Sequence, residues 1–350
     1  MRAMTVRLRR VRATTGVCAA VAVVACTSSS PSALRSVAGV AQGTTYTLQW
    51  AGGASEPEIA AAAEQELARI DALLSNYRPD STLERFNAAD TTEPLELPSE
   101  LVTLLELAKQ VHRASDGCFD PTVRPLVHAW GFDGDSPAVP ASEVIDAARA
   151  TVGLDKLELI DATHARKTVP GLALDMASIG QGWSAGRLAD LLERSGSTEY
   201  LAEIGGEVVA RGLKPDASPW RIGIENPVAG AGPALRMPPG TATAVITSGS
   251  YRHYFEADGR RFGHIIDPRS GWPVEHALVS VTVVGHDPAT AAAWGTALLC
   301  LGPPAAAVTA EREGIAALFW TARDENAAVL EQSPAFASEW RELLEETRGR

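Results

Sequence analysis

The chain has 350 residues, of which 45% are apolar and 21% charged, so its composition is that of a globular protein with a sizeable core. This composition argues against a disordered chain, and the length suits one large domain or two closely packed ones. The formal net charge of −12 argues against nucleic acid as a partner, because binding to phosphates needs clustered Lys and Arg.

The N-terminal segment differs from the rest of the chain. Several arginines precede an apolar stretch at residues 17–25, which is too short to cross a bilayer as a helix. Cys26 follows a small residue and begins a Ser-rich stretch, which resembles the lipid-modified cysteine of a bacterial lipoprotein. We therefore expect residues 1–25 to be a signal peptide, Cys26 to be lipidated and anchored to the membrane, residues 26–38 to be a flexible tether, and residues 39–350 to be the functional domain. An ordinary cleaved signal peptide is the alternative, and both place the mature protein outside the cytoplasm.

The chain has four cysteines. Cys18 would leave with the signal peptide and Cys26 would carry the lipid, which leaves Cys118 and Cys300. Two cysteines form neither a disulfide framework nor a cysteine-based metal site, and the sequence does not decide whether they pair. No other stretch approaches the apolar length of a membrane span, so we expect no transmembrane helix.

In the first half of the chain, helices alternate with polar breaks. Residues 39–50 are rich in Thr, Tyr and Leu and predict an opening strand. Apolar residues recur at helical spacing in residues 56–74, 100–114 and 142–151, which predicts three helices.

From residue 157 on, the pattern favours strands. Asp258-Gly259 predicts a hairpin turn, and Asp287 followed by Pro288 predicts the start of a helix that runs to about residue 301. Because strands and helices do not alternate regularly, we expect an α+β fold with mixed or antiparallel sheets and packed helices. The remaining predicted strands are 157–160, 172–176, 200–211, 220–225, 244–247 and 278–284, and the remaining helices are 182–195, 304–313 and 339–347.

Several polar clusters lie between these segments, and each alone has a structural explanation. Residues 178–182 (SIGQG) precede a helix and could present backbone N–H groups to a phosphate, but a plain turn at the start of a helix fits equally well. The pair Gly205-Gly206 indicates a bulge or a close approach of the backbone. Asp120 before a proline and His264 near Asp267 are both common in turns.

Taken together and in this order, the clusters resemble the FAD:protein FMN transferase family, also called the ApbE flavin transferases. The resemblance covers residues 42–318, nearly the whole mature chain. It rests on QGT (42–44), SNYRPDSTLERFN (75–87), CFDPTVRPLVHAWGF (118–132), LDMASIGQGW (174–183), IGGEVVARG (204–212), TSGSY (247–251), HIIDPRSGWP (264–273) and WGTALLCLGP (294–303).

The resemblance implies a binding site for FAD. It implies that the flat face of Tyr77 stacks on the adenine. The Gly205-Gly206 pair would let the backbone approach the ligand, and His264 and Asp267 are the candidate catalytic residues. His264 would position or deprotonate the incoming hydroxyl, and a turn-stabilising role is the alternative. The other FAD-site residues that it implies are Gln42, Cys118, Phe119, Asp120, Asp175, Gln181 and Ile266.

The implied reaction needs a metal ion. A Ser or Thr hydroxyl of an acceptor protein attacks the FMN-side phosphorus of FAD, AMP leaves, and Mg²⁺ neutralises the diphosphate through hard oxygen ligands. The resemblance implies the backbone carbonyl of Ser178, the hydroxyl of Thr296 and an Asp as these ligands. That Asp is replaced here by Ala292, and a second family Asp by Gly186. This loss should weaken metal binding, and an Ala292→Asp change should strengthen it.

Three functions therefore remain open. The first is an active transferase on an exported or membrane protein, whose metal site is completed by water, substrate phosphates, Glu207 or Asp267. The second is a lipid-anchored FAD-binding protein of the same fold with little or no activity. The third is a Mg²⁺-dependent FAD pyrophosphatase, in which water replaces the acceptor hydroxyl.

Overall fold

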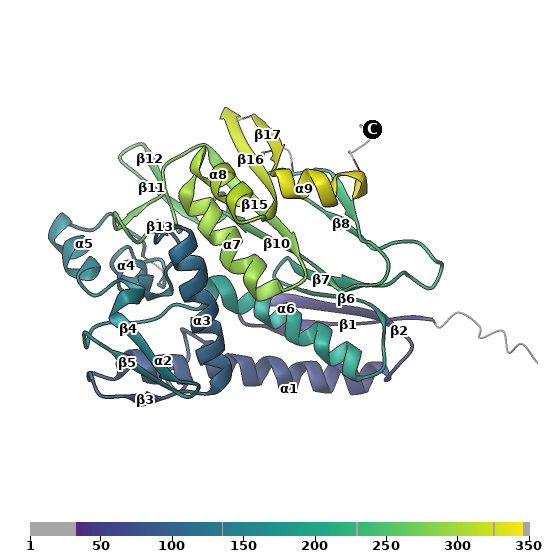
Figure 1. Cartoon of the computed structure of the whole chain (residues 1–350), viewed down its shortest axis with the longest axis horizontal. Coiled ribbons are helices and arrows are strands. Elements are labelled where there is room, and N and C mark those ends of the chain that lie inside the picture. The colour runs from purple at the N-terminus through teal and green to yellow at the C-terminus, as the bar shows by residue number, and fades with distance from the viewer. Residues whose placement is uncertain (1–32, 135, 229, 325, 346–350) are drawn as a thin grey trace, which may run out of the picture. The chain divides into compact units, whose positions relative to one another are not determined.

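The computed structural model describes residues 33–134, 136–228, 230–324 and 326–345, which belong to one compact unit. The predicted α+β fold is confirmed: an eight-stranded sheet lies at the centre, and its strands pair antiparallel (Figure 1). In spatial order the strands are β1 (Leu34–Ala41), β2 (Thr44–Ala51), β6 (Glu199–Ile204), β7 (Glu207–Arg211), β10 (Thr243–Gly249), β15 (Leu278–Gly285), β16 (Ala316–Asp324) and β17 (Ala327–Gln332).

Smaller sheets extend the fold around this centre. Two are three-stranded and two are hairpins. They comprise β3 (Leu95–Glu96), β5 (His164–Lys167) and β4 (Leu157–Asp161); β18 (Leu344–Glu345), β9 (Ala234–Arg236) and β8 (Arg221–Gly223); β11 (Tyr254–Ala257) and β12 (Arg260–Gly263); and β13 (Ile266–Asp267) and β14 (Trp272–Pro273).

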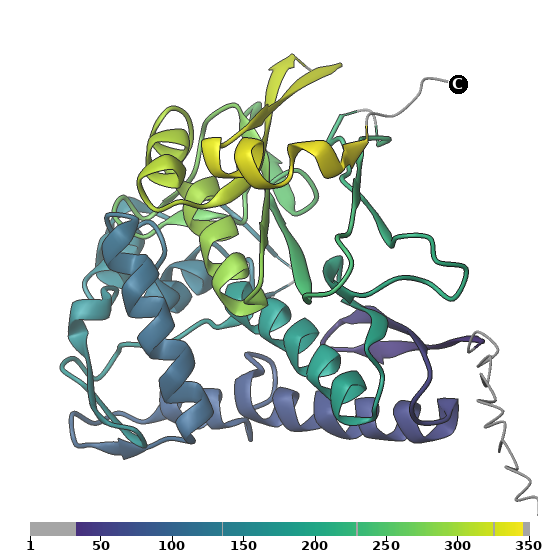
Figure 2. The ribbon, with the colours of Figure 1, turned by 45° about the vertical axis from the view of Figure 1, so that its right-hand side comes forward.

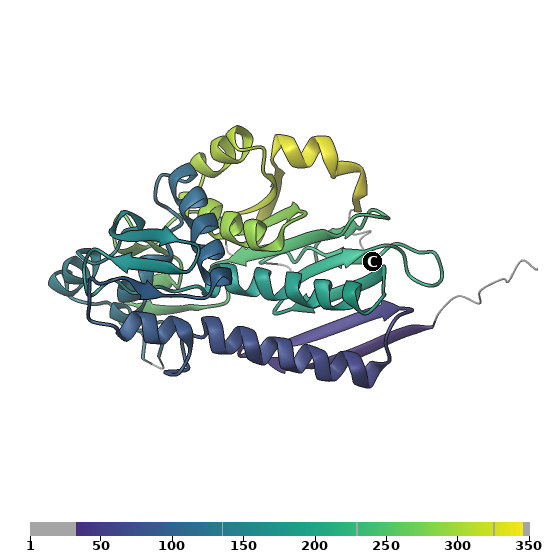
Figure 3. The ribbon, with the colours of Figure 1, turned by 60° about the horizontal axis from the view of Figure 1, so that its bottom comes forward.

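The two faces of the central sheet bury different clusters. Helices α1 (Glu56–Leu74), α6 (Ala177–Arg194) and α7 (Pro288–Leu301) pack on one face and form the main core with it (Figure 3). The other face is covered by the β8–β9–β18 sheet and by α9 (Pro334–Glu339), around Trp220 and Phe336. The remaining helices are α2 (Thr82–Ala88), α3 (Ser99–Ala114), α4 (Arg124–Ala129), α5 (Ser142–Arg149), α8 (Ala305–Arg312) and the short 3-10 turns η1 (Pro121–Val123), η2 (Leu154–Lys156) and η3 (Arg341–Leu343).

Helices α6 and α7 lie side by side (Figure 2). Small residues face each other between them. A Cβ added at Gly182 would lie 2.4 Å from the carbonyl oxygen of Pro288 and 2.6 Å from the Cβ of Ala292. A Cβ at Gly186 would lie 2.8 Å from Cγ of Pro288. The two helices therefore touch through their backbones, which fixes the start of α6 against α7.

Two segments predicted as single strands are hairpins. In residues 39–50, Gln42 (φ 52°) and Gly43 (φ 73°) form a turn between β1 and β2. In residues 200–211, Gly205 (φ 62°) and Gly206 (φ 93°) form the turn between β6 and β7, so this pair is a turn rather than a bulge within a strand. Consecutive positive φ values suit the twist of a two-residue hairpin loop.

Other boundaries also differ from the prediction. Residues 172–176 form no strand, although Leu172, Leu174 and Met176 are buried, because α6 begins directly afterwards at Ala177. Residues 34–38, which were predicted to belong to the flexible tether, are part of the fold, because β1 pairs with β2 along its whole length.

The C-terminal prediction was wrong. A helix was expected at residues 339–347, but its described part, residues 339–345, forms the end of α9, η3 and β18. The pair β16–β17 was not predicted. Helix α7, by contrast, begins as expected, with the Asp287 carboxylate accepting the N–H of Ala289 at 3.2 Å. Among the described residues, no helix combines the length and the apolar character needed to cross a membrane.

Candidate active site

A cavity of about 370 Å³ opens where the start of α6, the middle of α7, the turns after α1 and α3, and the segment before β13 meet. Its wall includes most of the predicted site residues, which come from distant parts of the chain. They are Tyr77, Cys118, Phe119, Asp120, Asp175, Ser178, Gln181, Gly205, His264, Ile266 and Thr296.

A second hollow of about 530 Å³ adjoins this cavity. Tyr77 and Gln181 line both hollows, and Tyr77 is 79% exposed between them. Gln42 lines the second hollow, where its side-chain amide is 3.0 Å from the hydroxyl of Ser184. An elongated ligand with two ring systems could therefore occupy both hollows and pass beside the Tyr77 ring.

Two predicted residues line neither hollow. Gly206 lies outside the cavity wall, in the β6–β7 turn, and donates its N–H to the carboxylate of Glu203 at 2.8 Å. Asp267 is also absent from the wall, and Cys26 lies outside the described residues.

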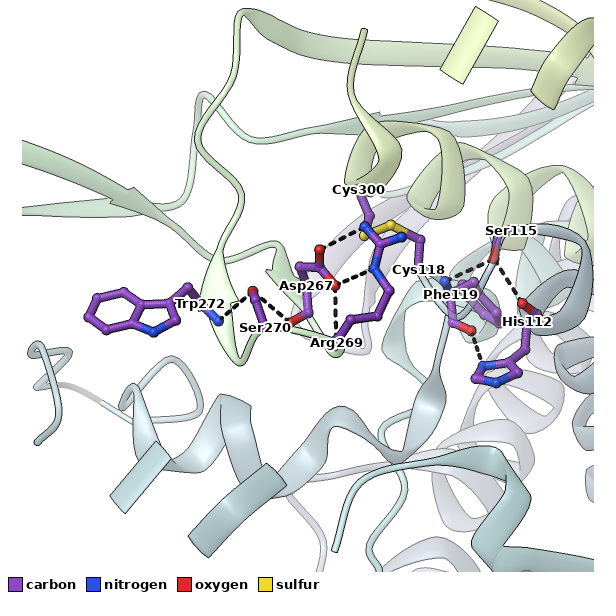
Figure 4. The surroundings of a disulfide bond; sticks show 9 residues. All are labelled: His112, Ser115, Cys118, Phe119, Asp267, Arg269, Ser270, Trp272 and Cys300. Atoms are coloured by element: carbon purple, nitrogen blue, oxygen red, sulfur yellow. Dashed lines mark hydrogen bonds and ion pairs between the residues drawn. A yellow bond between two sulfur atoms is a disulfide. The ribbon is translucent and has the colours of Figure 1, made fainter. Parts of the chain in front are cut away.

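Asp267 forms a closed turn with the residues that follow it (Figure 4). Its carboxylate accepts the backbone N–H of Arg269 at 2.9 Å and two guanidinium N–H groups of the same residue at 2.8 Å. Its backbone carbonyl accepts the N–H of Gly271 at 2.8 Å. Because both carboxylate oxygens are bound to Arg269 outside the cavity wall, the structure does not support the catalytic role predicted for Asp267.

Cys118 and Cys300 form a disulfide, with their Cα atoms 5.7 Å apart (Figure 4). Cys118 lines the cavity, and Cys300 lies one turn after Thr296 on α7. The bond therefore ties the turn after α3 to the helix that carries Thr296. Asp267 has an oxygen within 4.8 Å of both sulfur atoms, but the sulfurs are bonded to each other and leave no thiolate for a metal.

Asp120 is fixed in place by three hydrogen bonds. Its carboxylate accepts the N–H and the hydroxyl of Thr122, at 2.8 and 2.6 Å, and the N–H of Leu154 at 3.1 Å. Burial raises the pKa of this carboxyl above its usual range, and these hydrogen bonds and His112 oppose the shift. Asp120 therefore holds the wall in shape at the start of η1.

His264 has a defined orientation at the cavity. Its Nδ1 is 3.0 Å from the carbonyl oxygen of His253, which can only accept, so Nδ1 carries the proton and Nε2 keeps its lone pair. The two imidazole rings stack with their centroids 5.0 Å apart. Burial, followed by the charge of His253, lowers the pKa of His264 below 6.5, while the backbone contact and Asp175 oppose the shift. His264 is therefore a neutral base at neutral pH.

The first turn of α6 forms another part of the wall. The Asp175 carboxylate accepts the N–H of Ala177 at 2.9 Å, at the start of the helix, and Ser178 follows in the wall. A Cβ at Gly205 would lie 3.2 Å from Nε2 of Gln181, so Gly205 allows the β6–β7 turn to approach this helix. The first turn of α6 therefore brings Ser178 and Gln181 to the cavity wall.

Glu207 and Thr296 lie on the wall between β7, β10 and α7. Glu207 is 8% exposed, accepts the N–H of Thr247 at 3.2 Å, and burial raises its pKa to about 8. The hydroxyls of Ser248 and Thr296 are 3.4 Å apart. A Cβ at Gly295 would lie 2.8 Å from the Ser248 hydroxyl, so this glycine lets β10 approach α7.

Several residues of the wall were not predicted as site residues from the sequence, and two of them are polar side chains that matter to its geometry. Arg124 donates to the carbonyl of Asn76 at 3.1 Å and lies 3.6 Å and 3.7 Å from the carboxylates of Glu84 and Asp133. The only sequence feature that could have pointed to Arg124 is its position directly before a proline in a predicted turn. No sequence feature pointed to His253, because its contact with His264 forms only when the β11–β12 hairpin brings the two residues together.

Comparisons with known proteins identify the family of the chain. The sequence model of the ApbE family matches residues 42–319. The chain is 36% identical to the FAD:protein FMN transferase of Escherichia coli K12 over 280 residues, which cover 79% of this chain and 80% of that protein. The apo structure of the Pseudomonas stutzeri flavinyl transferase ApbE superposes with a TM-score of 0.79 at 38% identity and covers 88% of this chain and 97% of that one. The flavin transferase ApbE of Vibrio cholerae gives 0.79 at 32% identity and covers 88% and 99%. The chain therefore belongs to the ApbE family and is a transferase.

Proposed function

We propose that the chain is a Mg²⁺-dependent FAD:protein FMN transferase that attaches FMN to a Ser or Thr hydroxyl of an acceptor protein and releases AMP. The observation that carries the proposal is the convergence of the family-matching residues on one cavity, with an exposed aromatic between two hollows. A dinucleotide with two ring systems matches this shape.

The residues of the cavity suit this chemistry. The first turn of α6 and Arg124 both line the cavity in which we expect the diphosphate to lie. The acceptor oxygen forms a bond to the FMN-side phosphorus, the bond from that phosphorus to the oxygen bridging to AMP breaks, and AMP leaves. Nε2 of His264 takes the proton of the attacking hydroxyl, because Nδ1 is already bound to the His253 carbonyl.

The oxygens beside Thr296 fit a hard cation. The hydroxyls of Ser248 and Thr296 and the carboxyl of Glu207 lie on one wall, and Ser178 at the start of α6 also lines the cavity. We expect the Thr296 hydroxyl and the Ser178 carbonyl to hold the metal. When bound, Mg²⁺ would neutralise the diphosphate and the leaving AMP.

The proposed setting is the outer face of the cell membrane or the periplasm. Cys26 would carry the lipid, and the acceptor would be an exported or membrane protein. If Cys26 is the anchor, the parent protein takes up a radioactive fatty acid and a Cys26→Ser variant does not. A parent protein that takes up no labelled fatty acid would contradict the lipid anchor.

The activity is tested by incubating the purified chain with FAD, Mg²⁺ and an acceptor that carries a Ser/Thr target segment. Flavin fluorescence that stays with the denatured acceptor supports transfer, and an acceptor with the target residue changed to Ala is the control. Release of FMN and AMP without labelling would mean hydrolysis of FAD. Retention of FAD without any product would mean a binding protein.

A further inference from the structure

Four acidic side chains line the cavity wall, namely Asp120, Asp133, Asp175 and Glu207. They differ in how far hydrogen bonds and basic side chains of the protein offset their negative charge. Asp120 accepts three hydrogen bonds, and Asp133 lies 3.1 Å from His128 and 3.7 Å from Arg124. Asp175 is half-buried and accepts the N–H of Ala177 at the start of α6. These three carboxylates are held by the protein itself.

The negative charge of Glu207 is offset by fewer protein groups than the charges of these three aspartates. It is 8% exposed, and its hydrogen-bond donor is the backbone N–H of Thr247 at 3.2 Å. Within the described part of the chain, no Lys, Arg or His side chain pairs with its carboxylate. A buried carboxylate needs a proton or a cation to offset the loss of hydration. The open cavity beside Glu207 leaves room for a cation from solution.

Two contacts connect Glu207 through β10 to the part of the cavity wall that carries the Thr296 hydroxyl. Thr247 donates its N–H to the Glu207 carboxylate, and the next residue, Ser248, has its hydroxyl 3.4 Å from that of Thr296. The absence of a side chain at Gly295 permits this approach. Helix α7 itself offers alanines at positions 291–293, so no carboxylate comes from that part of the helix.

We propose that Glu207, from β7, is the charged ligand of the divalent cation that also binds the Thr296 hydroxyl, in place of a carboxylate from α7. This assignment rests on the proposed function only for the identity of the cation. Asp267 is the other acid that could have filled this place, but Arg269 occupies its carboxylate outside the cavity wall. Oxygen ligands of this kind suit Mg²⁺ and its spectroscopic substitute Mn²⁺.

The test is a titration of the full chain with Mn²⁺ in the absence of FAD, with free Mn²⁺ followed by electron paramagnetic resonance. We expect one site in the parent protein, a Kd about tenfold or more higher in Glu207→Gln, and a similar loss in Thr296→Val. Glu199→Gln is the matched control, because Glu199 begins β6 at the far end of the same hairpin, outside the cavity wall, and this variant should bind Mn²⁺ as the parent does.

Thermal unfolding of each variant separates ligand loss from misfolding, and Thr296→Val gives a second measurement if Glu207→Gln does not fold. Parent-like binding of Mn²⁺ by Glu207→Gln would overturn the proposal, as would a parent protein without any Mn²⁺ site. Because this readout needs neither FAD nor an acceptor, a Glu207-dependent Mn²⁺ site would stand even if the transfer assay failed. If the chain transfers FMN but Glu207→Gln binds Mn²⁺ as tightly as the parent, the assignment of Glu207 is refuted and the proposed function stands.

Discussion

At the scale of single residues, the orientation of His264 is the feature that most directly links structure to chemistry. The carbonyl of His253 fixes the proton on Nδ1, and the stacked ring of His253 and the burial of His264 both disfavour a second proton. Asp175 opposes this effect without reversing it. The sequence identified His264 through the motif around it, but not His253, which joins it only through the folded hairpin.

A prediction for the pH dependence follows. Because only neutral His264 can accept the hydroxyl proton and its pKa is lowered, the transfer rate at saturating Mg²⁺, where the cation keeps the Glu207 carboxyl ionised, should stay flat around pH 7 and fall only as the pH drops below 6.5. His264→Asn should reduce the rate by about 10²–10⁴-fold and still bind FAD. The pH profile of single-turnover transfer checks this. An acidic limb above pH 6.5, or an active His264→Asn protein, would argue against the assignment.

Ala292 allows a second prediction at this scale. It is 2% exposed and packs against Gly182, so a carboxylate introduced there would be buried between α6 and α7. Ala292→Asp should therefore lower the melting temperature without metal, because the new charge has no partner. If the added carboxylate binds the cation, Mg²⁺ should then raise the melting temperature of this variant more than that of the parent. An equal response to Mg²⁺ in both proteins would show that position 292 does not face the metal.

At the scale of elements, the close packing of α6 on α7 sets the shape of the site. Ser178 and Gln181 lie at the start of α6, and Thr296 lies on α7, so the separation of these helices decides how the two walls face each other. The sequence predicted both helices because their apolar spacing and the Asp287-Pro288 start are local signals. It did not predict that α6 starts at Ala177, since the buried residues before it resemble a strand.

This packing predicts different effects for two neighbouring glycines. Gly182→Ala should destabilise the protein by about 1–3 kcal/mol and weaken FAD binding, because its Cβ would meet Pro288 and Ala292 at 2.4 and 2.6 Å. Gly180→Ala is the matched control: its Cβ would lie 3.5 Å from Leu74, an ordinary contact, and the helix gains about 0.5–1 kcal/mol. Urea unfolding of both variants measures the difference. Equal stability of the two variants would mean that α6 and α7 are less tightly packed at Gly182 than the structure shows.

At the scale of the whole molecule, contacts between residues far apart in the chain set the strand order of the central sheet, which the sequence did not predict. The order of the eight-stranded sheet joins β2 to β6 and β10 to β15, pairs that no local pattern specifies. The strands β16 and β17 were missed, although β16 is a buried apolar run, because such a run also fits a helix. Most of the residues that the family motifs imply for the site line one cavity, a convergence that hydrophobic spacing alone does not indicate.

The disulfide provides a prediction at this scale. Cys118 and Cys300 are 182 positions apart, and their bond joins the cavity wall to α7. Reduction should lower the free energy of unfolding by about 2–5 kcal/mol, because the unfolded chain loses a constraint on a long loop. Urea unfolding with and without a reductant measures this effect. The double variant Cys118→Ala/Cys300→Ala is the control and should not respond to the reductant. A parent protein equally stable in both conditions would contradict a structural bond.

The central claim is that the two adjoining hollows beside Tyr77 bind one FAD molecule. Titration of the purified chain with FAD, followed by flavin fluorescence, tests it most directly. We expect saturable binding of one FAD per chain, weakened in Tyr77→Ala and unchanged in Tyr254→Ala, which removes an exposed aromatic outside both hollows. A folded protein without measurable affinity for FAD, or with an affinity that does not depend on Tyr77, would contradict this account.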